Sequence, residues 1–246
     1  MEQKVGPRTL LGVLTPSSNT VLEPFTSAML SDLPDVTAHF GRFRVREISL
    51  RDEALGQFDS APILDAAELL ADAKVGSIIW NGTSSGWMGF EADEALCREI
   101  TAATGIPAGT SVLALNEIFT TTGVERFGLV TPYLDEIQER IVANYQAAGF
   151  ACVAERHLGD RGNFSFSDYS EELIASMVRD VAAAKPEAIT VFCTNFRGTA
   201  LADRMEAELG IPIYDTVATG VWKGMKLANA DPSRIKGWGR LFSEVK

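Results

Sequence analysis

The 246-residue sequence has few of the side chains from which metal sites and disulfide frameworks are built. It contains 2 histidines and 3 cysteines, and the cysteines lie far apart, at positions 97, 152 and 193. An odd, small number of widely spaced cysteines does not form a disulfide framework. Neither His39 nor His157 lies in a metal-ligand pattern, so we expect no metal site.

Positive charge is also scarce. The 33 acidic residues outnumber the 22 Lys and Arg residues, which gives a net charge of -11 and a pI of about 4.7. A field of that sign repels nucleic acid and anionic membranes, so we expect neither as a partner. Any site for an anion must therefore depend on local hydroxyl and backbone N–H donors.

Long apolar runs are missing as well. None approaches the roughly 20 residues needed to span a bilayer, and the polar segment 1–8 has no signal-peptide core. The sequence also has no GxGxxG and no P-loop motif, so we expect no nucleotide cofactor. With 46% hydrophobic and 22% charged residues, the chain has an ordinary globular composition. We expect a cytoplasmic protein.

Short apolar runs alternate with helical patterns along the whole chain. Strands are predicted at residues 10–14, 76–80, 127–131, 150–155, 188–192 and 211–214, with an extended stretch at 39–48. Helices are predicted within 17–30 and at 62–74, 91–104, 134–148, 169–184, 199–209 and 219–228. This alternation predicts an α/β fold with parallel sheets flanked by helices. Ligands of such folds bind beyond the carboxyl ends of the strands.

The two halves of the chain resemble each other. Residues 11–16 recur as 127–132, residues 78–83 as 190–195, and residues 104–107 as 209–212. Three matches in the same order indicate a duplicated α/β unit. We therefore predict an N-terminal half at residues 1–118 and a C-terminal half at residues 119–246. The C-terminal segment of the chain can pack onto the N-terminal half in this arrangement.

Cys193 is the leading candidate for proton transfer. It ends a strongly apolar predicted strand, and Thr194, Asn195 and Gly198 lead into a predicted helix. Amide groups at a helix start favour a thiolate and lower the pKa of a thiol from about 8.5. A thiol tuned in this way can give or take a proton near neutral pH. The alternative is a buried structural cysteine, which better describes the other two cysteines.

Polar loops follow three other predicted strands. Residues 82–86 (Gly-Thr-Ser-Ser-Gly) leave room for a ligand, and their hydroxyl and N–H groups can hold a carboxylate; the alternative is an ordinary turn. Residues 16–20 (Pro-Ser-Ser-Asn-Thr) suit a helix cap, and we expect Asn19 to face the ligand while Thr20 caps. In the corresponding loop of the second half, Tyr133 can donate its O–H to a carboxylate.

Together these motifs resemble the aspartate/glutamate racemase superfamily over almost the whole chain. Within it they are most similar to the arylmalonate decarboxylase and maleate cis-trans isomerase branch. Residues 16–20 look like the isomerase signature, and residues 239–242 look like the decarboxylase ending. Gly82-Thr83-Ser84, Tyr133 and Cys193 look like the decarboxylase site.

The resemblance implies two pseudo-symmetric Rossmann-like halves, with the active site in the cleft between them. It implies no cofactor or metal, a small carboxylate or dicarboxylate substrate, and it is compatible with a homo-oligomer. Cys193 and Tyr133 are the implied catalytic residues. The implied substrate-binding residues come from loops of both halves: Pro16, Ser17, Asn19, Gly82, Thr83, Ser84, Thr194 and Asn195.

The sequence departs from the superfamily pattern at one position that matters for the chemistry. Racemases and isomerases of this superfamily carry a cysteine at each of two equivalent strand ends, whereas this chain has Gly82 at the first. One thiol suffices for decarboxylation, because loss of CO2 from a malonate-type acid leaves an enediolate that a single acid protonates. A cofactor-free decarboxylase is therefore the leading hypothesis. A maleate-type isomerase, an Asp/Glu-type racemase and a non-catalytic carboxylate-binding protein are the alternatives.

Overall fold

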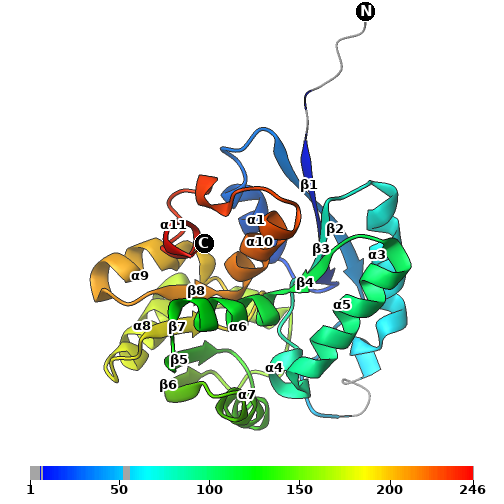
Figure 1. The fold of residues 1–246 in the computed structure, drawn as a ribbon. Coiled ribbons are helices and arrows are strands. Elements are labelled where there is room, and N and C mark those ends of the chain that lie inside the picture. Colours follow the sequence, from blue (N-terminus) through cyan, green and yellow to red (C-terminus); the bar gives the residue numbers. More distant parts are fainter. Residues whose placement is uncertain (1–5, 7, 52–55, 246) are drawn as a thin grey trace, which may run out of the picture.

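Two four-stranded parallel sheets form the framework of the protein (Figure 1). The computed structural model describes residue 6, residues 8–51 and residues 56–245, so most of the N-terminal segment 1–8 lies outside the described residues. The first sheet has the order β2-β1-β3-β4, and its strands are β1 (Thr9–Pro16), β2 (Val36–Phe43), β3 (Ser77–Trp80) and β4 (Ala108–Thr110). The second has the order β6-β5-β7-β8, and its strands are β5 (Arg126–Thr131), β6 (Ala151–His157), β7 (Ala188–Val191) and β8 (Ile213–Asp215).

Helices cover both sheets, which confirms the predicted fold class. They are α1 (Leu22–Met29), α3 (Ser60–Asp72), α4 (Ser85–Met88), α5 (Phe90–Thr104), α6 (Ser111–Thr122), α7 (Asp135–Ala147), α8 (Glu171–Ala182), α9 (Ala202–Leu209), α10 (Thr216–Leu227) and α11 (Leu241–Glu244). Short 3-10 turns are η1 (Gly56–Phe58), η2 (Ser165–Asp168), η3 (Thr199–Leu201) and η4 (Pro232–Arg234). In the described part of the chain, no helix has the length and apolarity to cross a membrane.

Residue types at the helix ends explain where several helices begin and stop. The side chains of Thr110 and Asp215 accept hydrogen bonds from the first turns of α6 and α10, so each begins directly after its strand. Gly105 and Gly210 end α5 and α9 in the left-handed conformation that glycine adopts without strain. The predicted start of the last long helix at residue 219 was late because the Asp215 cap was not recognised.

The strand register gives the internal symmetry residue by residue. Leu11 pairs with Ser77 in the first sheet, and Phe127 pairs with Ala188 in the second. With Leu11 and Phe127 equivalent, Gly82 corresponds to Cys193. The sequence match of residues 78–83 to 190–195 was therefore one residue out of register. Both segments are continuous apolar runs of buried parallel strands, so their alternation could not fix the alignment.

Helices α6 and α10 join the two halves by packing against each other (Figure 1). Helix α10 covers β3 and β4 of the first sheet. In return, Phe119 of α6 places its ring 5.3 Å from that of Phe127 and 6.2 Å from that of Tyr214, both in the second sheet. The sequence predicted neither β4 nor α6. Strand β4 is only three residues long, and α6 runs through the predicted boundary between residues 118 and 119.

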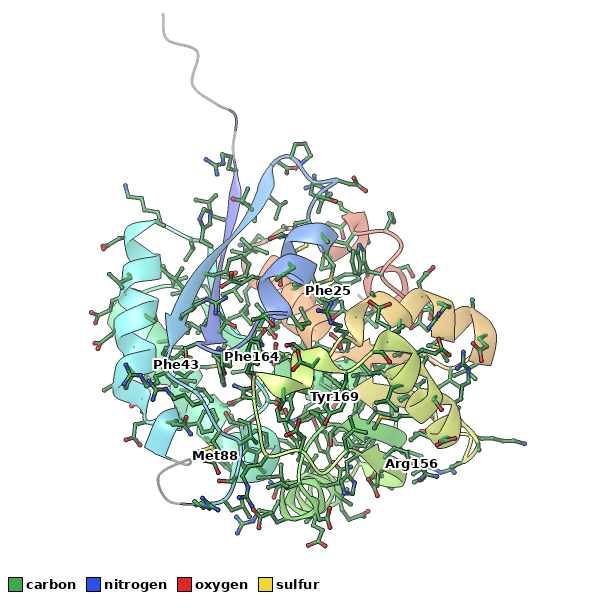
Figure 2. The ribbon with its side chains drawn as sticks, turned by 180° about the vertical axis from the view of Figure 1, so that it is seen from behind. Phe25, Phe43, Met88, Arg156, Phe164 and Tyr169 are labelled. Atoms are coloured by element: carbon green, nitrogen blue, oxygen red, sulfur yellow. The ribbon has the colours of Figure 1, made fainter. Side chains whose placement is uncertain are left out.

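The segment after α10 returns to the first half. The ring of Trp238 packs edge-on against Phe25 of α1 at 6.2 Å, and Arg234 forms an ion pair with Asp35 at 2.5 Å. Phe25 lies on the face shown in Figure 2. Strand β2 ends at Phe43, so residues 44–48 of the predicted extended stretch belong to a loop rather than a strand.

Candidate active site

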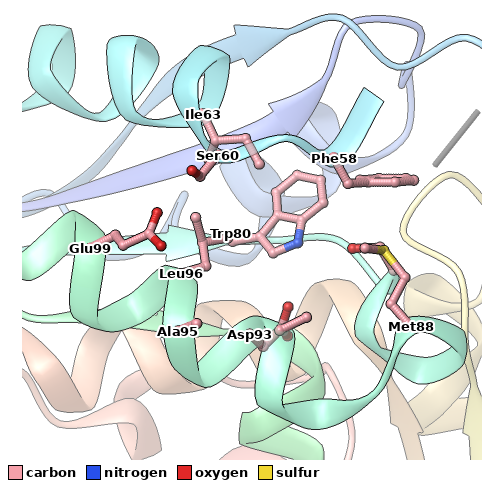
Figure 3. A pocket seen from close by; sticks show the side chains of 11 residues that line it. Phe58, Ser60, Ile63, Trp80, Met88, Asp93, Ala95, Leu96 and Glu99 are labelled. Carbon is pink, nitrogen blue, oxygen red and sulfur yellow. The ribbon is translucent and has the colours of Figure 1, made fainter. Parts of the chain in front are cut away.

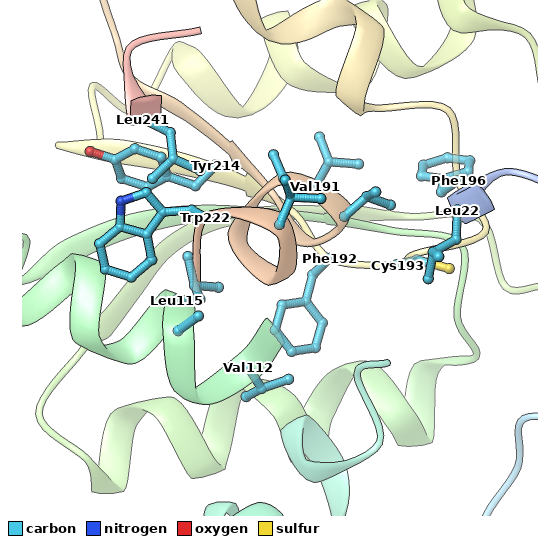
Figure 4. Packing of buried hydrophobic residues seen from close by; sticks show 14 of the residues in the cluster. Leu22, Val112, Leu115, Val191, Phe192, Cys193, Phe196, Tyr214, Trp222 and Leu241 are labelled. Carbon is cyan, nitrogen blue, oxygen red and sulfur yellow. The ribbon is translucent and has the colours of Figure 1, made fainter. Parts of the chain in front are cut away.

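Cys193 lies in the turn that follows β7, at the edge of the buried apolar cluster near Phe196 (Figure 4). Its side chain is 3% exposed. Burial raises the pKa of the thiol to about 12, although hydrogen bonds from the Tyr133 hydroxyl and the Asn195 backbone N–H oppose the rise. The expected lowering of the pKa by a helix start is therefore wrong. A 3-10 turn separates the thiol from α9, which begins only at Ala202.

Tyr133 links the Cys193 turn to the first half of the protein. Its hydroxyl lies 2.6 Å from Thr83 Oγ1, in the loop after β3. The phenol ring is held edge-on between Trp87, at 5.3 Å, and Phe166, at 5.6 Å. Burial is the main reason that the pKa of Tyr133 lies well above its usual value, so the phenol keeps its proton. Tyr133, Thr83 and Cys193 are thus brought together.

The loop at residues 16–20 is bound to the Cys193 turn. Asn19 Nδ2 donates to Thr194 Oγ1 at 3.2 Å, and the backbone N–H of Thr20 donates to Asn195 Oδ1 at 2.9 Å. Asn19, Thr194 and Asn195 are all nearly inaccessible to solvent. Loops that are far apart in sequence therefore form one polar cluster between the halves.

Asn19, rather than Thr20, caps the helix that follows. Its Oδ1 accepts hydrogen bonds from the backbone N–H groups of Val21 and Leu22, both at 2.9 Å, whereas Thr20 is exposed. The predicted division of roles is corrected by this contact. The amide of Asn19 faces both the helix start and the Cys193 turn.

Two predicted binding residues of the same loop differ in position. Pro16 is buried as the last residue of β1, but Ser17 is exposed. Ser17 Oγ accepts from the backbone N–H of Val45 at 3.2 Å, so its side chain faces the loop after β2. The guanidinium of Arg42, which the sequence analysis missed, donates to the carbonyl oxygens of Ser17 and Asn19 and holds the loop in place.

The loop after β3 places its small residues as predicted. Thr83 and Ser84 are each 5% exposed, and the carbonyl of Gly82 accepts from Ser111 Oγ at 2.7 Å. This loop also fits the G-x-S-x-G pattern of serine hydrolases, with Ser84 as the middle serine. That chemistry needs a histidine at the serine. His39 instead contacts Thr37, and the ring of His157 is held by two carboxylates.

Asn163 is a further polar residue that the sequence analysis missed. It lies between β6 and η2, and its backbone carbonyl accepts from Asn195 Nδ2 at 2.5 Å. Its own Nδ2 is buried without a hydrogen-bond partner, which leaves a donor available to a ligand. An asparagine in an irregular loop carries no sequence signal beyond its polarity.

Loops from both halves cover this cluster. The backbone N–H of Ile48 donates to the carbonyl of Arg161 at 3.3 Å, and Glu47 forms an isolated antiparallel bridge with Gly162. Next to Asn163, the Phe164 side chain is 58% exposed, on the face shown in Figure 2. The candidate catalytic groups beneath are 5% exposed or less. They therefore act in a medium where electrostatic interactions are strong.

Two buried carboxyl groups lie behind the strand-end loops. Asp93 lines a cavity of about 80 Å³ beside Trp80 and Ser84 (Figure 3), and burial raises its pKa to about 6. Asp215 accepts from Thr199 Oγ1 at 2.6 Å, and burial raises its pKa to about 7. When ionised, Asp215 also raises the pKa of Cys193. Both carboxyls keep one oxygen without a partner.

The side chain of His157 is half-buried. Its Nδ1 lies 2.7 Å from Glu155 Oε2 and its Nε2 lies 2.9 Å from Asp135 Oδ1. Burial lowers its pKa, but the hydrogen bonds to these two carboxylates outweigh burial and raise the pKa above its usual value. Asp135 begins α7 just after Tyr133, so His157 joins the end of β6 to the loop that carries Tyr133.

Comparison with known proteins identifies the family. The chain matches the arylmalonate decarboxylase family over residues 21–242. It is 26% identical to the arylmalonate decarboxylase of Bordetella bronchiseptica over 185 residues, which cover 74% of this chain and 77% of that protein. It is 24% identical to the maleate isomerase of Nocardia farcinica over 243 residues, which cover 95% of each chain.

The fold is shared with a solved relative. The maleate isomerase Iso from Pseudomonas putida S16 superposes with a TM-score of 0.87 at 22% identity, over 97% of this chain and 99% of that chain. The sequence matches and the shared fold agree. The protein therefore belongs to the arylmalonate decarboxylase and maleate isomerase family of the aspartate/glutamate racemase superfamily.

Proposed function

We propose that the protein is a cofactor-independent decarboxylase of a small malonate-type acid, with Cys193 as the proton donor. The observation that carries this proposal is a single buried thiol at one of two equivalent strand ends, with Gly82 at the other. Proton transfer on both faces of a substrate needs an acid or base at both strand ends. Protonation of an enediolate on one face needs only Cys193.

The hydroxyl and N–H groups around Tyr133 suit the first step of this reaction. One substrate carboxylate is held by Thr83, Ser84 and Tyr133, and the bond to the second carboxylate breaks as CO2 leaves. The electron pair of that bond forms an enediolate on the retained carboxylate, where the same donors stabilise the added charge. Removal of one such donor typically costs about 10²–10³ in rate.

Cys193 completes the reaction by donating its proton to the α-carbon. The S–H bond breaks, a C–H bond forms, and the resulting thiolate regains a proton from solvent. A thiol with a pKa of about 12 is a weak acid, but an enediolate is a much stronger base at carbon. The raised pKa keeps the thiol protonated at neutral pH, which is the form that the step requires.

A maleate-type isomerase is the second candidate, and the polar cluster around Asn19 favours it. Asn19, Asn195 and the unpartnered amide of Asn163 supply more donors than one carboxylate needs. They suit a dicarboxylate whose two charges are both retained. The isomerase of Nocardia farcinica also matches nearly the whole chain. Against this candidate, attack on a double bond requires a thiolate, and burial disfavours a thiolate at Cys193.

Proton NMR in D2O separates these reactions. The enzyme is incubated separately with substituted malonates, with maleate and with amino acids, and Cys193→Ala is run beside Cys152→Ala as a matched thiol control. The decarboxylase is supported if the wild type and Cys152→Ala convert a malonate to a monoacid with one α-deuterium and Cys193→Ala does not. Conversion of maleate to fumarate, or α-exchange without carbon loss, supports an isomerase or racemase. Ligand binding without any turnover contradicts both.

A further inference from the structure

The indole of Trp80 lies where a side chain at residue 82 would project. A Cβ atom built on Gly82 would lie 2.1 Å from Trp80 Cζ2 and 2.4 Å from Cη2. Carbon atoms without a bond between them do not approach so closely. A thiol cannot stand at position 82 while the indole keeps this position.

The indole is buried and packed by its neighbours, and it also borders the cavity of about 80 Å³ beside Asp93. Trp80 is 1% exposed, and its ring packs against Phe43 with centroids 4.9 Å apart. Figure 3 shows the indole enclosed by side chains from α3, η1 and α5, with Ile63 and Leu96 among them. A side chain added at residue 82 would therefore force the indole to shift away from its packing partners, which costs stability.

Hydrogen bonds also hold the loop that carries Gly82. Its carbonyl accepts from Ser111 Oγ at 2.7 Å, and the preceding Asn81 donates from Nδ2 to the carbonyl of Val217 in α10 at 3.3 Å. A Cβ on Gly220 of α10 would lie 2.5 Å from Asn81 Nδ2, so the helix and this loop are already in close contact. These contacts oppose a movement of the loop away from the indole.

The internal symmetry shows that two differences occur together. The register that equates Gly82 with Cys193 also equates Trp80 with Val191. The half with the thiol has a small residue two positions before it, and the half without the thiol has a tryptophan there. The large side chain and the missing side chain compensate each other in volume.

We propose that Trp80 makes the site one-sided: its indole fills the volume opposite Cys193, so that only the Cys193 face of the substrate carbanion receives a proton. The inference rests on the proposed function, because it assigns the reaction specificity of that same site. The α-carbon gains its proton from the S–H of Cys193. Removal and return of that proton by the same thiol leave the configuration unchanged. Inversion would require a second acid on the side that the indole occupies.

A double-mutant cycle tests the packing without any substrate. Gly82→Cys alone is expected to lower the Tm by roughly 5 °C, because the new side chain meets the indole. Trp80→Val, which copies Val191, is expected to lower the Tm by leaving a cavity. The Tm of the double variant should fall by less than the two single decreases added together, because each change relieves the strain or the cavity left by the other. Additive losses, or a Gly82→Cys variant as stable as the wild type, would overturn the proposal.

Proton exchange tests the chemistry. In D2O, the wild type should not invert the chiral product acid, whereas Trp80→Val/Gly82→Cys should racemise it with α-deuterium uptake, roughly 100-fold or more above the wild-type rate. The matched control is Trp80→Val/Gly82→Ser, which restores the volume with a hydroxyl in place of a thiol and should not racemise the acid. A thermal unfolding transition must first show that both double variants are folded.

The two readouts separate this inference from the proposed function. If the cysteine variant is folded and still decarboxylates, but does not racemise the product, the indole is not what makes the site one-sided and the inference is wrong. If no malonate is turned over by any variant while the Tm losses are non-additive, the proposed reaction fails and the packing role of Trp80 stands.

Discussion

Replacement of Tyr133 by phenylalanine removes one hydroxyl from the centre of the site and leaves the ring packing intact. The ring remains between Trp87 and Phe166, but Thr83 Oγ1 loses the partner that lies at 2.6 Å. An unpaired buried hydroxyl costs about 1–3 kcal/mol, so the free energy of unfolding should fall by that amount in urea titrations. Loss of a donor to the developing enediolate should lower kcat by about 10²–10³.

The companion variant Thr83→Val separates the two effects of this change. Alone it removes one hydrogen-bond partner from the buried Tyr133 hydroxyl, but combined with Tyr133→Phe it removes both members of the pair. The double variant should therefore lose less unfolding free energy than the two single changes together, with a coupling of about 0.5–3 kcal/mol. Its turnover should stay low, because the donors remain absent. Additive stability losses, or a kcat within about threefold of the wild type in Tyr133→Phe, would refute this reasoning.

The remaining predictions concern three other groups. Cys193→Ala should reduce turnover by at least roughly 10²-fold while Cys152→Ala leaves it unchanged, as measured by product NMR. The raised pKa of His157 stabilises the fold below its ordinary pKa of 6.5, and this stabilisation is lost as the pH rises through the raised value; the Tm difference between the wild type and His157→Gln should therefore shrink from pH 6 to pH 9. Asp215 has a pKa raised from 3.8 to about 7, so its ionisation destabilises the fold as the pH rises between those values. Urea titrations should show Asp215→Asn gaining stability relative to the wild type over this range, and a constant difference would contradict the assignment.

Periodicity predicted the elements that carry the site. Strands β1, β3, β5 and β7 are continuous apolar runs, and the residues directly after them include Asn19, Thr83, Tyr133 and Cys193. Parallel strands place such loops at one edge of a sheet, so the candidate residues could be named before their contacts were known. The matched segments also predicted a duplicated α/β unit, and the structure shows two sheets with corresponding strand orders.

Contacts between distant residues could not be predicted in the same way. The cap formed by Asn19 and the buried amide of Asn163 depend on how loops from the two halves meet. The raised pKa of Cys193 comes from burial, which outweighs the local donors that its sequence suggested. In the sequence Trp80 is simply an apolar residue of a predicted strand. Only the structure shows that its indole occupies the space into which a side chain at residue 82 would project.

The most direct test of the central claim is the isotopic composition of the product formed in D2O from a prochiral disubstituted malonate. The account predicts one deuterium at the α-carbon and a single enantiomer from the wild type, and no product from Cys193→Ala. A racemic product, or turnover that survives in Cys193→Ala, would show that Cys193 is not the sole proton donor of this site.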